Sequence, residues 1–217
     1  MDDHICETET WLFEQAARQC VKNLSRHDFD AHYYPDREAA VSAILKMAAP
    51  FSTFGFGGSS TTRGLGLADA LREMGKTVHD HWQPGLNKSA DLAIRLDQGR
   101  CDCFLCSANA ISMTGEIVNV DGVGNRTSAM TFGSPKVIIV AGVNKLAPDL
   151  AGALDRVRRI AGPMRAKSLN MNTLCAETGV CADCSSPQRI CRITTILHRR
   201  PLMTDISVFL INAKLGF

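Results

Sequence analysis

The sequence lacks an excess of charge, a long hydrophobic run and the features of an export signal. Its formal net charge is +2, which gives no indication of binding to nucleic acid or to an anionic membrane. The longest apolar stretch, Val137 to Val143, has the length of a strand and is too short to cross a membrane. The N-terminal segment is acidic and polar, without the basic and apolar regions of a signal peptide. We therefore expect a cytoplasmic protein that has no nucleic acid partner and no membrane span.

Internal repeats and low-complexity linkers are also missing, and 217 residues are enough for one domain with a full core. Hydrophobic and charged residues make up 45% and 21% of the chain, which is ordinary for a globular protein. The stretch from Lys136 to Val143 is apolar at consecutive positions, so a strand there would be buried on both faces. We predict an α/β protein of one domain, residues 1–217, with a mostly parallel sheet and helices outside it.

The remaining elements are predicted from hydrophobic periodicity and capping residues. Helices are expected at residues 8–25, 36–49, 63–74, 87–98, 128–132 and 148–160, and strands at 29–33, 53–56, 77–81, 101–108, 117–120, 193–198 and 206–211. The last of these strands could pair with its copy across a homodimer.

A dense polar run between Ser107 and Arg126 follows a predicted buried strand. Polar side chains and glycines directly after such a strand are costly for stability and typical of a site. The residues that we predict to bind a ligand here are Ser107, Asn109, Asn119, Gly122, Gly124 and Asn125. An ordinary hairpin with a glycine-rich turn is the alternative.

A second polar loop, Gly57 to Thr62, lies between a predicted strand and a predicted helix. Backbone N–H groups at such a junction suit an anion, so Gly57, Gly58, Ser59, Ser60 and Thr61 are candidate ligands for a phosphate or carboxylate. The loop is neither a P-loop nor a GxGxxG loop, and a simple capped turn is the alternative. Both polar segments would lie at the carboxyl ends of parallel strands, where ligands bind in such sheets.

Three charged residues of the first segment are candidates for catalysis. Glu116 or Asp121 could act as a general base or hold a hydroxyl group, and Arg126 could clamp a carboxylate. A turn residue is an equally good interpretation of Glu116, and Asp121 before a glycine also suits an Asx-turn.

The nine cysteines fall into groups. Cys101, Cys103 and Cys106 are expected to pack in the core as thiols. The other group is Cys175, Cys181, Cys184 and Cys191, whose spacing C-x5-C-x2-C-x6-C predicts four thiolate ligands for an iron–sulfur cluster or for zinc. Free thiols or disulfides without any metal remain the alternative.

Four segments together resemble the LUD-domain family, the lactate utilisation proteins: residues 55–60, 107–126, 140–145 and the cysteine segment. The likeness extends from about Glu9 to Phe217. It implies the fold of glucosamine-phosphate deaminase, ribose-5-phosphate isomerase and CoA transferases, which is a Rossmann-like, three-layer α/β/α sandwich with a mostly parallel sheet. A short cysteine-rich segment follows near the C-terminus.

The resemblance also guides the interpretation of both loops. Gly57 to Thr61 is similar to the phosphate loop of ribose-5-phosphate isomerase, and Asp121-Gly122 is similar to the start of its Asp-Gly-Ala-Asp-Glu motif. Residues 123–125 replace the later acidic residues, so sugar-phosphate isomerisation is not expected. Glu116 is the nearest counterpart of the CoA-transferase nucleophile.

The family relationship implies a role in the oxidation of lactate to pyruvate beside iron–sulfur oxidoreductase subunits. We expect a subunit that binds a small anionic metabolite, a carboxylate or a phosphate. Two alternatives are a stand-alone enzyme for a phosphorylated or CoA-linked molecule and a non-catalytic binding or regulatory module. A homo-oligomer is a further expectation.

Overall fold

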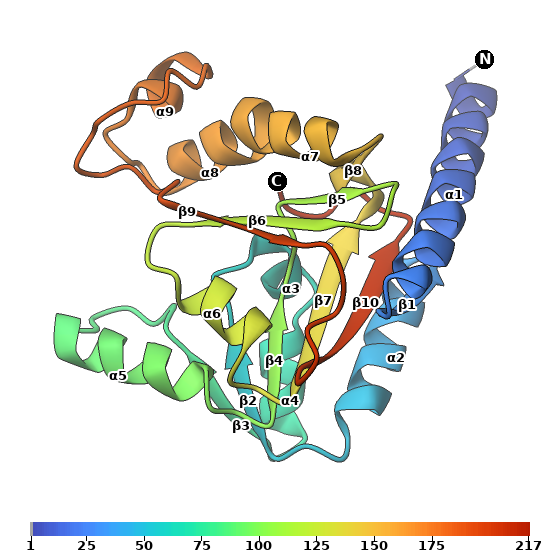
Figure 1. Cartoon of the computed structure of the whole chain (residues 1–217). Coiled ribbons are helices and arrows are strands. Elements are labelled where there is room, and N and C mark those ends of the chain that lie inside the picture. The colour runs from blue at the N-terminus through green and yellow to red at the C-terminus, as the bar shows by residue number, and fades with distance from the viewer. Residues whose placement is uncertain (1) are drawn as a thin grey trace.

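The computed structural model describes residues 2–217, and a six-stranded sheet forms its centre (Figure 1). The strand order is β1-β10-β7-β4-β2-β3, and every neighbouring pair is parallel. The strands are β1 (Asp30–Tyr34), β2 (Thr53–Phe56), β3 (Thr77–Asp80), β4 (Cys103–Cys106), β7 (Lys136–Gly142) and β10 (Asp205–Ile211). The predicted mostly parallel sheet is therefore confirmed.

Helices cover both faces of this sheet and complete three layers. One face packs against α1 (Asp2–Arg26), α5 (Lys88–Gln98) and α6 (Asn125–Thr131), and the other against α2 (Arg37–Ala48), α3 (Ser60–Gly64) and α4 (Leu67–Glu73). Strand β7 serves both faces, since Val137 and Ile139 belong to one core cluster and Ile138 and Val140 to the other. This two-sided burial is the reason for its continuous apolar sequence.

A second sheet of four short strands was not predicted. It has the order β8-β5-β6-β9, formed by β8 (Leu146–Ala147), β5 (Ala110–Ser112), β6 (Ile117–Asp121) and β9 (Ile193–Leu197). Figure 1 shows it across the upper ends of β4 and β7, beneath α7 (Leu150–Arg156). The predicted strand 101–108 ends at Cys106, and the hairpin partner of β6 is the separate strand β5.

Several helices differ from their predicted bounds, among them α6, which begins at Asn125 and not at residue 128. Helix α1 begins at Asp2, and Gly66, with φ of +66°, separates α3 from α4 where one helix was expected. Asp149 caps α7 by accepting from the Gly152 amide. The helical path then continues through a π-helical stretch (Val157–Ala161) and α8 (Gly162–Ser168), before α9 (Leu174–Thr178). Sequence periodicity did not anticipate the π-helical stretch, which adds a residue to the turn.

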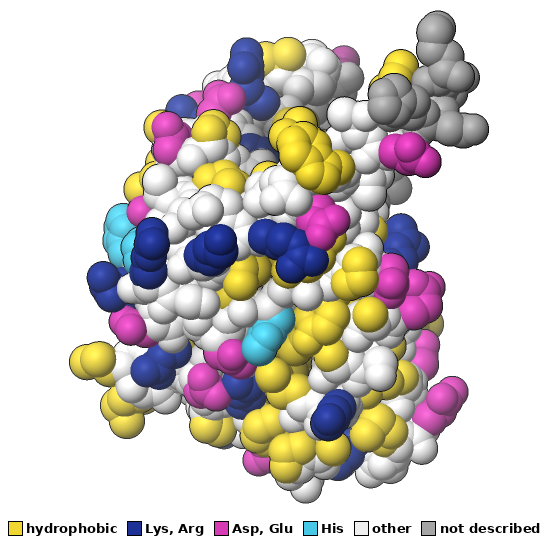
Figure 2. Space-filling view, turned by 90° about the vertical axis from the view of Figure 1, so that its right-hand side faces the viewer, with side chains coloured by type: hydrophobic (Ala, Val, Ile, Leu, Met, Phe, Trp, Pro, Cys, Tyr) yellow, Lys and Arg dark blue, Asp and Glu magenta, His cyan; other side chains and the backbone are white. Residues whose placement is uncertain are grey.

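Strand β10 lies between β1 and β7, so the chain itself pairs both of its edges. The expectation that this strand could pair across a homodimer is wrong, because only an edge strand offers unpaired backbone groups. Within residues 2–217, no helix combines the length and the apolar character that a membrane crossing requires. The face on the side of α1 carries a row of basic side chains above a group of hydrophobic ones (Figure 2).

Candidate functional site

Arg126 is the centre of the polar segment, and the protein itself uses its guanidinium. Its nitrogens donate to the side chains of Asp121, Asn119 and Asn109 and to the carbonyls of Ser107 and Val120. The side-chain oxygens of both asparagines also accept hydrogen bonds from the backbone: Asn119 Oδ1 from the Asn109 amide, and Asn109 Oδ1 from the Val120 amide. The guanidinium therefore fixes β6 and the chain after β4 in position. Its geometry does not support the predicted clamp on a ligand carboxylate.

Asp121 is similarly occupied. One carboxylate oxygen lies 2.8 Å from Arg126, and the other accepts from the amide and hydroxyl of Thr127 at the start of α6. Such a carboxylate at a helix N-terminus is stabilised by the free N–H groups there. The carboxylate is therefore engaged by Arg126 and by the first turn of α6, six residues along the chain, and these contacts differ from the local bond of an Asx-turn.

Glu116 lies in the hairpin turn between β5 and β6, where its carboxylate accepts from the Thr114 hydroxyl. The residues that line the cavity described below do not include it. The structure therefore does not bring Glu116 together with Asp121 and the Gly57 loop, although adjacency in sequence had suggested this.

The glycines after β2 lie in close contact with side chains of the neighbouring segments. A Cβ atom on Gly57 would lie 3.1 Å from the Cδ atom of Arg126, and one on Gly58 would lie 3.0 Å from the indole nitrogen of Trp82. Ser59 caps α3 by accepting from the Thr62 amide. The predicted capped turn is therefore present, and the loop also forms one wall of a cavity.

A cavity of about 390 Å³ lies at the carboxyl ends of β2, β4 and β7. It brings together most of the predicted ligand-binding residues from both loops: Gly58, Ser59, Ser60, Thr61, Ser107, Asn109, Asp121, Gly122, Asn125 and Arg126. Gly57, Asn119 and Gly124 do not line it. The position agrees with the general rule for ligand sites in open parallel sheets.

Sequence reasoning missed Lys145, which the structure places at the centre of this site. It follows β7 in a 3₁₀ turn (Val143–Lys145), and it lines the cavity although its side chain is almost fully buried. Its Nζ atom donates to Thr61 Oγ1 at 2.9 Å and to Ser107 Oγ at 2.8 Å. The run from Val140 to Lys145 contained the signal, because a lysine directly after a buried parallel strand lies at the ligand edge.

Burial, together with the nearby charges of Arg156 and Arg126, lowers the pKa of Lys145 to about 7. Arg156 also holds the turn in place, since it donates to the Asn144 carbonyl at 3.0 Å. A lysine with such a pKa is present both as an ammonium ion and as a free amine near neutral pH. Perturbed lysines of this kind concentrate at functional sites.

The cavity has an excess of positive charge. Arg126 pairs with Asp121, and Arg95 pairs with Asp91 at 2.8 Å. Arg165 also lines the cavity and stacks on Trp82 at 4.6 Å from the ring centroid. Among residues 2–217, neither Arg165 nor Lys145 has a carboxylate partner. An anionic ligand would therefore complement the site.

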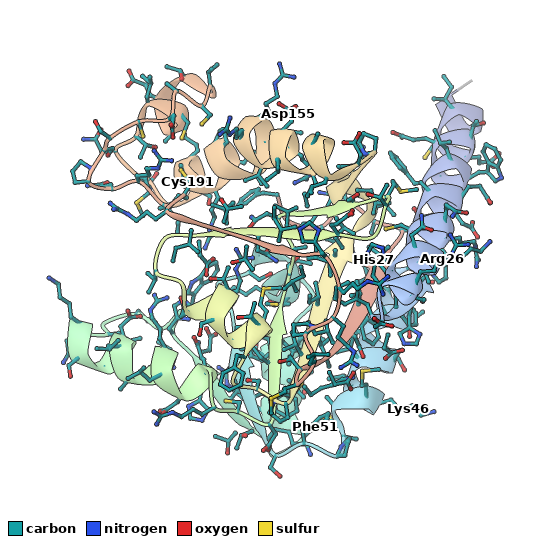
Figure 3. All side chains as sticks on the ribbon, viewed as in Figure 1. Arg26, His27, Lys46, Phe51, Asp155 and Cys191 are labelled. Atoms are coloured by element: carbon teal, nitrogen blue, oxygen red, sulfur yellow. The ribbon has the colours of Figure 1, made fainter. Side chains whose placement is uncertain are left out.

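The four C-terminal cysteines line a second cavity, of about 510 Å³. Cys191 lies where this segment joins β9 (Figure 3). Arg189 holds the loop together, since it donates to the carbonyls of Cys184 and Cys191. In the described part of the chain, no three His, Cys, Asp or Glu side chains converge tightly enough for a metal ion. All nine cysteines are free, and Cys101, Cys103 and Cys106 are buried as predicted.

The family model of the LUD domain matches residues 17–211. The chain belongs to the LUD domain family. This family is associated with lactate utilisation, in agreement with the resemblance of the sequence segments. Its fold is similar to the crystal structure of a DUF162 family protein from Deinococcus radiodurans, with a TM-score of 0.54 and 13% sequence identity. The match covers 92% of this LUD domain chain and 98% of that protein, and no curated protein matches.

Proposed function

We propose that this LUD domain protein binds a small carboxylate in the cavity around Lys145, as a subunit in the oxidation of lactate to pyruvate. The observation that carries the proposal is the position of Lys145, whose Nζ lies among the hydroxyls of Thr61 and Ser107 at the cavity wall. An ammonium group in such a dry site binds an anion more strongly than it would in water.

Arg165 supports the same ligand class. Its side chain lines the cavity with the guanidinium over Trp82, and a guanidinium can donate two parallel hydrogen bonds to a carboxylate. Lys145 would then contact the oxygen on the neighbouring carbon of a 2-hydroxy or 2-oxo acid. A phosphate is also anionic and is the competing ligand for these two side chains.

Calorimetric titration of the protein with L-lactate, pyruvate and inorganic phosphate tests the proposal, with lactamide as the neutral analogue. Lys145→Met is expected to weaken carboxylate binding about tenfold or more, since a charged hydrogen bond contributes about 1.5–3 kcal/mol. Lys167→Met, at an exposed position of α8, is the matched control and should bind like the parent. Equal binding of lactate and lactamide, or an unchanged affinity in Lys145→Met, would refute the proposal.

The cysteine segment supports a redox part of this function. The soft thiolates of Cys175, Cys181, Cys184 and Cys191 suit an iron–sulfur cluster, and the four residues line one cavity. In the described chain no three of them converge, so the loop would have to draw them together around the cluster. A cluster bound there would supply one-electron transfer to iron–sulfur oxidoreductase subunits. Both cavities share Arg165 and Ile190 in their walls, so the cysteine segment adjoins the anion site.

Protein purified without oxygen should contain iron and sulfide and show the broad visible absorption of a cluster. Cys184→Ser should lose both iron and absorption, whereas Cys6→Ser, on the exposed part of α1, should keep them. Zinc in place of iron would point to a structural metal. Metal content unchanged by Cys184→Ser would remove the cysteine segment from the proposal.

A further inference from the structure

The hydrogen bonds of Lys145 suit an amine that acts as a nucleophile. A neutral amine has two N–H donors and one lone pair, and the oxygens of Thr61 and Ser107 accept both donors. Each hydroxyl has a carbonyl acceptor for its own proton, in Leu215 at 3.3 Å and in Ala108 at 3.4 Å. Within residues 2–217, Nζ has no third partner, so its lone pair is left unused beside the cavity.

We infer that Lys145 forms an imine with the carbonyl carbon of a small 2-oxo carboxylate bound in this cavity. The inference rests on the proposed anion site, because Arg165 must hold the carboxylate while Nζ approaches the neighbouring carbonyl. Covalent attachment of this kind fixes a ligand that has few other groups for recognition. It narrows the ligand class to acids that carry a ketone or aldehyde next to the carboxylate.

The reaction needs no oxidant or reductant. The lone pair of Nζ forms a bond to the carbonyl carbon, and the carbonyl electron pair moves to oxygen. A proton passes from nitrogen to that oxygen, for which the hydroxyls of Thr61 and Ser107 provide a short path. The nitrogen electron pair then forms the C=N bond as the C–O bond breaks, and the second nitrogen proton passes to the departing oxygen. The oxygen leaves as water with both protons, and the neutral imine remains. Hydrolysis reverses each step and returns the free amine.

A neutral amine is required for the attack, and the site provides it. Burial lowers the pKa of Lys145 to about 7, so a large fraction of the side chain is deprotonated at neutral pH. Desolvated lysines that react with carbonyls are activated in the same way.

An alternative is a serine nucleophile at Ser107, with Lys145 as its base. That arrangement requires the Ser107 hydroxyl to donate its proton to Nζ. In the structure the Ser107 hydroxyl donates to the Ala108 carbonyl instead. The Nζ atom of Lys145 donates to the Thr61 hydroxyl as well as to that of Ser107. Both contacts favour Lys145 as the nucleophile.

Reductive trapping of the full chain tests the inference. The protein is incubated with pyruvate and cyanoborohydride, digested, and mapped by mass spectrometry. We expect the reduced adduct at Lys145, in clear preference to exposed lysines such as Lys46 and Lys167. Acetone, a carbonyl compound without a carboxylate, should label Lys145 far less, and an excess of lactate should protect it. Lys145→Arg, which keeps the charge but has no nucleophilic amine, should lose the adduct.

The outcomes separate this inference from the proposed function. If calorimetry shows pyruvate binding but the adduct is spread over exposed lysines, the imine is refuted and the anion site stands. If lactate, pyruvate and phosphate all fail to bind, the proposed function fails as well. The competition by lactate uses the parent protein, so the test does not depend on the folding of a variant.

Discussion

Among single residues, Lys145 has an effect on stability that depends on pH. The pKa of its buried ammonium is lowered to about 7, whereas an unfolded lysine keeps a value near 10.4. Between these values the unfolded chain binds a proton that the folded chain does not, so the free energy of unfolding rises with pH. Below pH 7 both states are protonated, and the penalty for burying the charge is fully present.

We therefore expect the stability contributed by this side chain to increase above pH 7, with a limiting slope of about 1.4 kcal/mol per pH unit. This slope is measured by urea unfolding of the parent and of Lys145→Met. The pH series begins at pH 7 and ends where thiols of the unfolded chain begin to ionise. The difference between the two curves isolates the lysine, because the other titrating groups are common to both proteins. Parallel curves would contradict the lowered pKa.

At the scale of elements, the end of β7 is fitted closely to the C-terminal segment. A Cβ atom on Gly142 would lie 2.2 Å from the Ala213 carbonyl oxygen and 2.8 Å from the Leu215 amide nitrogen. The same segment covers the site, since the Leu215 carbonyl accepts from Thr61. Gly142 thus allows the turn with Lys145 to lie in contact with the C-terminal segment.

Gly142→Ala should destabilise the protein by about 1–3 kcal/mol, because the backbone must move to relieve the overlap. Carboxylate binding should weaken as well, since Thr61 and Lys145 would lose their cover. Gly64→Ala is the matched control: a Cβ atom added to Gly64, in α3, would meet open space, so a loss of stability is not expected there. Thermal unfolding and titration calorimetry of both variants decide the question.

At the scale of the whole molecule, the six-stranded sheet provides the stability that keeps both loops in place. Phe104 on β4 is fully buried, whereas Phe132, after α6, has 70% of its surface exposed. Phe104→Ala should cost about 3–5 kcal/mol, through the lost burial and the cavity that remains. Phe132→Ala should change the free energy of unfolding by no more than about 0.5 kcal/mol. Equal effects in urea unfolding would contradict this assignment of the core.

The sequence alone was sufficient for the α/β class, the parallel sheet and the family. These features depend on local patterns, such as the two-sided burial of β7 and the helix cap at Asp36, and both are present in the structure. The sequence also indicated the ligand edge of the sheet, because the carboxyl ends of parallel strands must lie together. It could not show that the side chains of Asp121 and Arg126 are occupied by contacts within residues 107–127.

The tertiary structure decided which side chains face the cavity. Lys145 is 84 positions from Thr61 and 38 from Ser107, and no local pattern records contacts over such distances. Glu116 is close in sequence to the polar segment, yet the hairpin carries it away from the cavity. Hydrophobic periodicity fixes the face of an element, but the order of strands in the sheet determines which strand ends become neighbours. For this reason Lys145, after β7, became the centre of the site, whereas Glu116 lies outside it.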